Sequence, residues 1–141
     1  MSTTAPRPVA TAGIDLNGRI RDVEAAIGAP VGADWRGRAA AAVAALRSAF
    51  LVHVDDTEGP DGRYADLVTA APRLAGAVGR LVREHPRIGG ELSDLARVLT
   101  DPATARPPVG AAVVLRRLVR HQERGADLLY EAYVIDLGGE T

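Results

Sequence analysis

The stretch FLVHVDDTEGPDGRYADLV, residues 50–68, decides how this chain folds. Apolar residues recur at helical spacing on both sides of GPDG, residues 59–62, and these four residues at face value form a hairpin turn. A reversal at that point would separate His53 from His85 by roughly 25 Å, at about 1.5 Å of helix rise per residue. A kink that keeps the direction of the helix would instead bring the two side chains close to one level.

We predict the kink. The inward-facing positions of this helix continue beyond GPDG at Tyr64, Leu67 and Val68, which a hairpin turn would not require. The chain then reverses at TAAP, residues 69–72. On this interpretation His53 precedes the reversal by about seventeen residues and His85 follows it by about thirteen, so the two lie nearly level.

The composition is typical of a helical protein. The chain has 141 residues, enough for one domain with a sizeable core, and only 4% of them are aromatic. Abundant Ala, Leu and Arg with few aromatic residues favour helices over a β-sandwich. The net charge of −1 indicates no nucleic-acid partner, and the lack of cysteine excludes disulfides, zinc–thiolate sites and thiol catalysis. The sequence has no nucleophile triad, phosphate-binding loop or dinucleotide fingerprint.

The start of the chain differs in pattern from the rest. Residues 1–13 lack the basic and then apolar order of an export signal, so we expect a disordered N-terminal tail. Residues 14–141 form the expected single domain. The apolar run at residues 39–52 is short and broken by Arg47, so it predicts a buried helix and no membrane span. We expect a cytoplasmic protein, and the use of Arg as the only basic residue besides His is typical of a high-GC bacterium.

Four amphipathic segments are separated by breaks at residues 28–30, 69–72 and 100–108. The first segment is short, and Asp34 and Pro72 are suited to begin the second and the third. Short links between such segments predict an all-α, antiparallel up-down four-helix bundle with a kinked second helix. The inward-facing positions are Leu16, Ile20, Val23, Ile27, Val43, Leu46, Phe50, Leu74, Val78, Leu81, Ile88, Leu92, Leu95, Ala111, Val114, Leu118, Gly125, Leu128 and Ala132.

The three histidines of the chain also fall on inward-facing positions. His53 is on the second helix, His85 on the third and His121 on the fourth. With the kink, and with another reversal near residue 104, the three side chains reach nearly one height in the bundle. We therefore expect one shared site. The alternative is that each is a hydrogen-bonded core residue, which is the commoner role of a single inward-facing histidine.

Glu58 is the carboxylate best placed to join the histidines. It follows His53 by five residues, so on an ideal helix it points about 140° away from that side chain. A local π-bulge or the nearby Pro60 would have to rotate it inward. With that rotation, Glu58 reaches the height of His85.

The other carboxylates have structural interpretations. Glu84 is expected to face sideways, toward an arginine or solvent. Glu131 lies roughly 15 Å beyond His121 along the helix, so it should not share the histidine site. We expect Glu131 and Asp136 to tie arginine side chains and the kink together.

Three segments resemble the hemerythrin-like (HHE) domains: FLVHVDDTEG at 50–59, RLVREH at 80–85 and RHQERGADLLYEAY at 120–133. The likeness covers roughly residues 34–140. It implies a four-helix bundle whose inward-facing histidine and carboxylate side chains hold a non-haem di-iron centre. The last segment, together with the DLGGE that follows it, looks like a subgroup of such proteins from high-GC bacteria.

The ligand set departs from the pattern of that family. The first helix has no histidine, and Thr57 stands where the family has a glutamate. Gly89 stands in place of a second histidine on the third helix, after Pro86, which interrupts the helical hydrogen bonds. Gly125 and Ala126 stand near the place of the family's aspartate. The residues that carry over are His53, His85 and His121, with Glu58 as a shifted candidate.

Three imidazoles and one carboxylate suit a single borderline metal with an open position. The predicted metal ligands are His53, Glu58, His85 and His121. Non-haem iron is favoured, zinc is the alternative, and one metal is favoured over two. The short first helix would barely reach the site. Gly89 and Gly125 either leave a small cavity beside the histidines or only let the helices approach closely, with Pro86, Gly89 and Gly90 bending the third helix.

Three functions are compatible with this pattern. The first is a hemerythrin-like metal-binding protein that handles or senses O₂, NO or redox state, or uses the metal for chemistry on a small molecule. The second is a metal-free bundle that works as a small-molecule enzyme or binding protein. The third is a helical interaction module with the histidines in its core. We expect a monomer or a homodimer, with no nucleic-acid or membrane partner.

Overall fold

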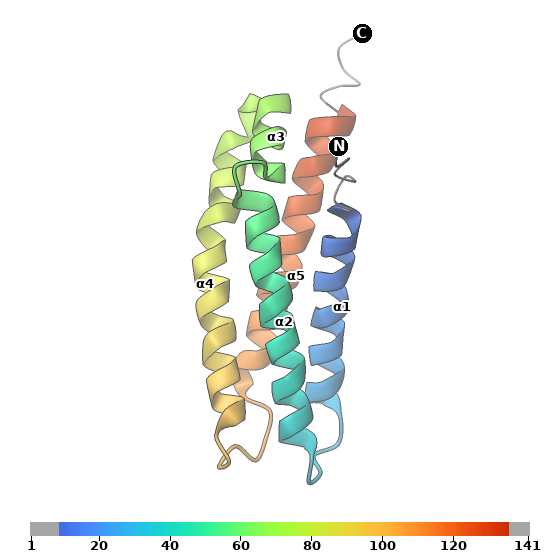
Figure 1. Cartoon of the computed structure of the whole chain (residues 1–141), viewed down its shortest axis with the longest axis vertical. Helices are drawn as coiled ribbons and strands as arrows, with labels where there is room; N and C mark the ends of the chain where they lie inside the picture. The colour runs from blue at the N-terminus through green and yellow to red at the C-terminus, as the bar shows by residue number, and fades with distance from the viewer. Residues whose placement is uncertain (1–8, 136–141) are drawn as a thin grey trace, which may run out of the picture.

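The computed structural model describes residues 9–135. These residues form helices and no strand, which confirms the predicted all-α class. The elements are α1 (Val9–Gly28), α2 (Trp35–Glu58), α3 (Arg63–Ala70), the 3₁₀ turn η1 (Pro72–Leu74), α4 (Ala75–Thr100), α5 (Val109–Tyr130) and the π-helical turn η2 (Glu131–Ile135). The long helices α1, α2, α4 and α5 lie side by side (Figure 1). The α1–α2 and α4–α5 loops lie at one end of the molecule, and α3 with η1 lies at the other.

The segment at residues 59–62 does not reverse the chain. α3 lies beyond the end of α2, and the chain turns back only between α3 and α4 (Figure 1). The helix is interrupted here, which is a larger change than the predicted kink. The Gly59 N–H donates to the carbonyl of Asp55 and closes α2, and the Gly62 N–H donates to the carbonyl of Gly59 at 2.7 Å. Pro60 has no N–H to donate, and two helices form here. A proline alone does not end a helix in this protein, because α4 continues through Pro86, which corrects the interruption expected there.

Gly62 is the residue that this turn requires. A Cβ atom at this position would lie 2.7 Å from the Gly59 carbonyl oxygen and closer still to that of Thr57. Real Cβ atoms do not approach backbone oxygens so closely, so only glycine allows the chain to pass here. The close passage sets where α3 starts relative to the end of α2.

The first helix is longer than the sequence indicated. α1 begins at Val9 and has 20 residues, so the predicted tail boundary at residue 13 is corrected for residues 9–13. A helix can extend beyond its buried stripe when nothing in the local sequence stops it, and this stretch contains no proline. The remainder of the predicted tail, residues 1–8, lies outside the described residues.

The buried apolar residues form two clusters. The large core joins α1, α2, α4 and α5, and the small core joins α3, η1, the start of α4 and η2. The large core consists of Leu16, Ile20, Val23, Trp35, Ala39, Val43, Leu46, Ala49, Phe50, Ile88, Leu92, Leu95, Leu99, Ala111, Val114, Leu115 and Leu118. The small core consists of Tyr64, Leu67, Ala71, Leu74, Val78, Leu81 and Ala132. Most of the predicted inward-facing residues are in one of these clusters, which confirms the helical periodicity.

The histidines lie between the two cores. The ring of Phe50, from the large core, is 6.0 Å from that of His53 and 5.8 Å from that of His85. The ring of Tyr64, from the small core, stacks on His85 at 6.0 Å. The interruption at residues 59–62 therefore places a polar layer between two apolar ones.

The segment at residues 35–70 is long and apolar enough to cross a membrane. Core helices of folded domains pass the same test. Within α2 eight residues are buried against the other helices, and they include His53 and Thr57. The lack of a membrane partner stays a prediction from the sequence.

Candidate metal centre

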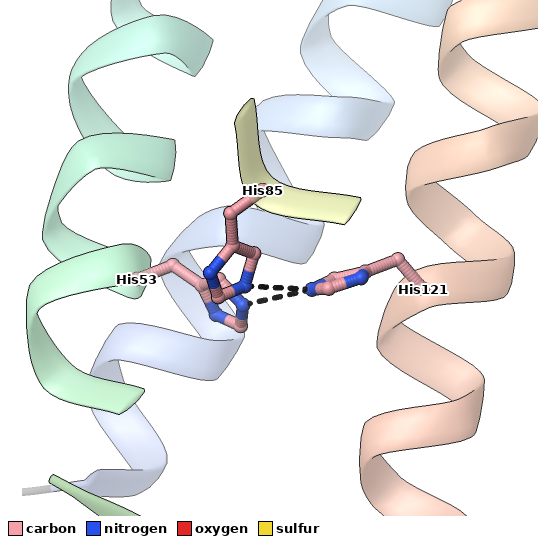
Figure 2. A group of neighbouring side chains, drawn as sticks. All are labelled: His53, His85 and His121. Carbon is pink, nitrogen blue, oxygen red and sulfur yellow. Dashed lines mark hydrogen bonds between the residues drawn. The ribbon is translucent and has the colours of Figure 1, made fainter. Parts of the chain in front are cut away.

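The structure brings the three histidines together from three helices, with their rings directed at one point (Figure 2). His121 Nε2 lies 3.2 Å from His53 Nε2 and 3.1 Å from His85 Nε2. The side chains are nearly inaccessible, with 6%, 3% and 1% of His53, His85 and His121 exposed. The expectation of one shared level for the three residues is confirmed.

Glu84 fixes the tautomer of His121. Its Oε1 lies 2.8 Å from His121 Nδ1, while its Oε2 pairs with Arg124. A carboxylate oxygen accepts hydrogen bonds, so Nδ1 of the imidazole carries the proton and donates it. The neutral ring then has a lone pair at Nε2, which is the atom directed at the other histidines.

Glu58 does the same for His85. The Nδ1 atom of His85 donates to Glu58 Oε2, so its Nε2 also presents a lone pair. Two lone pairs then face each other at 3.1 Å between His85 and His121. A cation between them, either a metal ion or an added proton on one ring, would remove the repulsion between the lone pairs. Burial lowers the pKa of His121 below its ordinary value and so opposes the proton on that ring.

His53 completes the group in a different way. Among the described residues no carboxylate pairs with its Nδ1, and its ring orientation comes from stacking on Phe50. Burial, followed by the charges of His121, His85 and Arg63, lowers the pKa of His53 to about 3. The ring is therefore neutral at pH 7 and available as a ligand.

The spacing of the three Nε2 atoms fits one metal ion. Bonds of ~2.0–2.1 Å to a tetrahedral metal place neighbouring ligand nitrogens about 3.3 Å apart. The measured separations of 3.1 and 3.2 Å are close to that value, and all three ligand atoms lie within 4.8 Å of one another. These two separations therefore suit one ion held by three imidazoles.

Only some of the carboxylates lie where the sequence predicted them. Glu58 reaches the site, but it lies behind His85, outside the group of atoms that face the centre. Glu84 pairs with an arginine, as expected. Its second contact, with Nδ1 of His121, was not expected from the sequence. A residue next to an inward-facing histidine points at the adjacent helix in a bundle, and that signal would have found it. Glu131 forms an ion pair with Arg73, while Asp136 lies outside the described residues.

A pocket of about 180 Å³ adjoins His53 and His121, and we call it the histidine pocket. Gly125 lines it, as the sequence suggested, but Gly89 does not. A Cβ at Gly89 would make an ordinary van der Waals contact with the Phe50 ring at 3.7 Å, so this glycine does not open space beside the histidines. The other residues that line it are Asn17, Thr57, Arg63, Tyr64, Gln122, Ala126 and Leu129.

The presence of Asn17 corrects the expectation that the first helix barely reaches the site. α1 extends along the histidine pocket, and the Gln122 side-chain amide donates to Asn17 Oδ1 at 3.3 Å. Thr57 is fully buried beside His53, and its hydroxyl donates to the carbonyl of that residue at 2.9 Å. The space that a longer side chain would fill at position 57 is therefore left to the histidine pocket.

Comparisons with protein-family models, with curated proteins and with solved structures find no match for this chain. What the site can do therefore follows from its own geometry.

Proposed function

We propose that this chain is a hemerythrin-like protein, an antiparallel up-down four-helix bundle, that binds one divalent metal ion through the Nε2 atoms of His53, His85 and His121. Iron is the favoured metal and zinc the alternative. The protein handles or senses a small molecule such as O₂ or NO at this centre, or acts on one. The cytoplasmic location and the monomeric or dimeric state stay predictions from the sequence.

The observation that carries this proposal is the pair of lone pairs on His85 and His121. Each ring is held by a carboxylate at Nδ1, and the two Nε2 atoms face each other at 3.1 Å. A carboxylate behind a histidine is also the usual way in which proteins fix the orientation of a metal-binding imidazole. A core histidine without a ligand would direct its Nε2 lone pair at a donor.

Three protein ligands leave at least one coordination position for a small molecule. When bound, the metal would supply a Lewis acid or, as iron, a redox centre. The residues of the chain contribute the surroundings. Glu58 and Glu84 hold the rings, and the side chains of the two cores limit the access of water. Burial raises the pKa of Tyr64 to about 12, so its hydroxyl keeps its proton beside the histidine pocket.

The test is elemental analysis, with an optical spectrum, of protein purified without an immobilised-metal column. We expect close to one iron or zinc per chain, and almost none in His85→Ala. Leu81→Ala is the matched control, because Leu81 lies one turn away on α4 and is equally buried. It should lower stability and leave the metal content unchanged.

No metal after anaerobic Fe(II) or Zn(II) loading would contradict the proposal. Equal metal content in the wild type and His85→Ala would also contradict it, since the ion would then be bound elsewhere. Two metals per chain would contradict the single-ion geometry and would favour a di-metal centre.

A second candidate function is supported by the histidine pocket itself. If the protein holds no metal, the 180 Å³ pocket with its buried polar side chains still suits a metal-free enzyme or binding protein for a small molecule. Ligand binding that is indifferent to chelators would then be the distinguishing result.

A further inference from the structure

The charged side chain among the described residues that line the histidine pocket is that of Arg63, while the carboxylates of Glu58 and Glu84 lie behind His85 and His121, outside the lining. Arg63 lines the pocket at the first residue of α3, and no aspartate or glutamate is among the described residues that line it. Besides the two histidines, the remaining polar groups are the side chains of Asn17, Thr57, Tyr64 and Gln122, all of them uncharged.

The half-buried side chain of Arg63 has one buried nitrogen atom without a partner. Its Nε atom is buried without a hydrogen-bond acceptor, and no carboxylate of residues 9–135 forms an ion pair with this side chain. A buried donor of a charged group costs free energy when it has no acceptor. An anion at this position would accept a hydrogen bond from the Nε atom of Arg63. By contrast, Arg124 on the other side of His121 is paired with Glu84.

Part of the lining of the histidine pocket is apolar. Gly125, Ala126 and Leu129 form it on α5, and Gly125 leaves open space where a side chain would otherwise extend. A cavity of about 150 Å³ is large enough to bind benzene. The pocket, at about 180 Å³, therefore accommodates a molecule with a short apolar body and one charged end.

We propose that the histidine pocket binds a small organic carboxylate of about the size of benzoate. The guanidinium of Arg63 pairs with the carboxylate, and the apolar body lies against Gly125 and Leu129. This goes beyond the proposed metal site because it depends on the pocket and on Arg63, so it applies to the metal-free protein as well. In the metal-bound protein the same ligand would lie beside His53 and His121.

The experiment is a calorimetric titration of the full chain with benzoate, in a chelator-treated form of verified metal content and in a metal-loaded form. Benzyl alcohol is the neutral analogue and inorganic phosphate is the alternative anion. We expect benzoate to bind both forms and benzyl alcohol to bind more weakly. Arg63→Gln should weaken benzoate by about ten-fold or more, as the loss of a charge-assisted pair does, and should leave benzyl alcohol nearly unchanged.

Two matched controls separate the site from general effects. Arg38→Gln removes an exposed arginine that pairs only with Asp34, and it should leave benzoate binding unchanged. Gly125→Leu fills the pocket and should abolish binding of both benzoate and benzyl alcohol. Gly90→Leu makes the same change on α4, where a Cβ also meets no atom, and should have no effect on binding. Thermal unfolding shows that each variant is folded.

The proposal is overturned by equal affinity of the wild type and Arg63→Gln for benzoate, by benzoate binding that persists in Gly125→Leu, or by no binding of benzoate to either form. Phosphate binding without benzoate binding would overturn the organic ligand class in favour of an inorganic oxyanion. Metal content measured on the same samples keeps the two proposals apart. A metal-free protein that binds benzoate through Arg63 contradicts only the metal centre, and a metal-binding protein that ignores benzoate contradicts only this inference.

Discussion

The large core and the histidine centre meet on α5, where Leu118 and His121 lie one turn apart. Both side chains are fully buried, with 0% and 1% exposed. Leu118 contributes apolar volume to a cluster of seventeen residues, and other shapes of similar volume would fill the same space. His121 contributes two nitrogen atoms with fixed directions, one to Glu84 and one to the two other histidines. The two positions are equally buried but have different requirements. Position 118 needs a side chain of similar volume, and position 121 needs nitrogen atoms in fixed directions.

Substitution of these two residues should give the largest difference between the effects on stability and on metal binding. Leu118→Ala should cost about 2–5 kcal/mol of unfolding free energy, because it leaves a cavity, and should keep the metal stoichiometry. His121→Gln should abolish metal binding, because His121 Nε2 is the atom nearest to both other ligands. Denaturant unfolding of the metal-free proteins and elemental analysis of the loaded ones check the two outcomes. If Leu118→Ala also lost its metal, the core and the centre would not be separable.

The turn between α2 and α3 provides the next test, because it connects the large core to the small one. Gly62→Ala should cost about 1–3 kcal/mol, since the new Cβ would overlap two backbone oxygens and force a shift of the chain. Gly90→Ala, on an open helix surface, should instead stabilise by roughly 0.5–1 kcal/mol through helix propensity. Thermal or urea unfolding measures both. Similar values for the two variants would mean that the turn is not constrained at residue 62.

Two glutamates on α4 have similar surroundings but differ in their contact with the histidine centre. Glu84 and Glu91 both have 24% of the side chain exposed, and both pair with an arginine of α5, but only Glu84 holds a histidine. Glu84→Gln should lower the metal affinity by about 10–100-fold, as the loss of an orienting carboxylate does, and Glu91→Gln should not change it. Competition with a chromophoric chelator gives the affinities. Equal affinities would show that Glu84 serves only as an ion-pair partner.

The smallest expected effect is a pH dependence of the metal-free protein. The pKa of His53 is about 3 in the folded protein and 6.5 by its ordinary value, so the unfolded chain takes up the proton first as pH falls. The contribution of neutral His53 to the free energy of unfolding is therefore fully present above pH 6.5 and is lost progressively as the pH falls toward 3. The groups facing His53 are His85, His121 and Arg63.

Urea unfolding in a chelator at pH 7.5 and at pH 5.5 measures this loss, since carboxylates contribute little in that range. His53→Gln should reduce the difference between the two pH values. A substitution that left the difference unchanged would assign the pH dependence to other groups.

Much of the fold was predictable because helical periodicity is a local property. The stripes on four segments, the breaks near residues 28 and 100–108 and the late reversal at residues 69–72 all follow from residues close in sequence. Pro60 indicated that the helix is disturbed near this position, but the sequence did not distinguish a kink in one helix from an interruption between two. That outcome depends on how closely Gly62 approaches the backbone of Thr57 and Gly59.

The three histidines of the site were predictable, and the carboxylates that hold them were predictable only in part. The three histidines shared a face and a height, so their meeting followed from helix geometry. The place of Glu58 behind His85 and the contact of Glu84 with His121 depend on side-chain directions across two helices. Spacing along one helix does not determine such contacts.

The sequence by itself determined the all-α class, the buried stripes and the convergence of His53, His85 and His121, because each follows from a 3.6-residue period and from chain length. Only the packed helices show which ring nitrogen faces the centre, which carboxylate holds which ring, and that the buried Nε atom of Arg63 has no partner beside a pocket. The physical reason is that hydrogen bonds depend on direction over a few tenths of an ångström, and this precision arises only when separate helices pack.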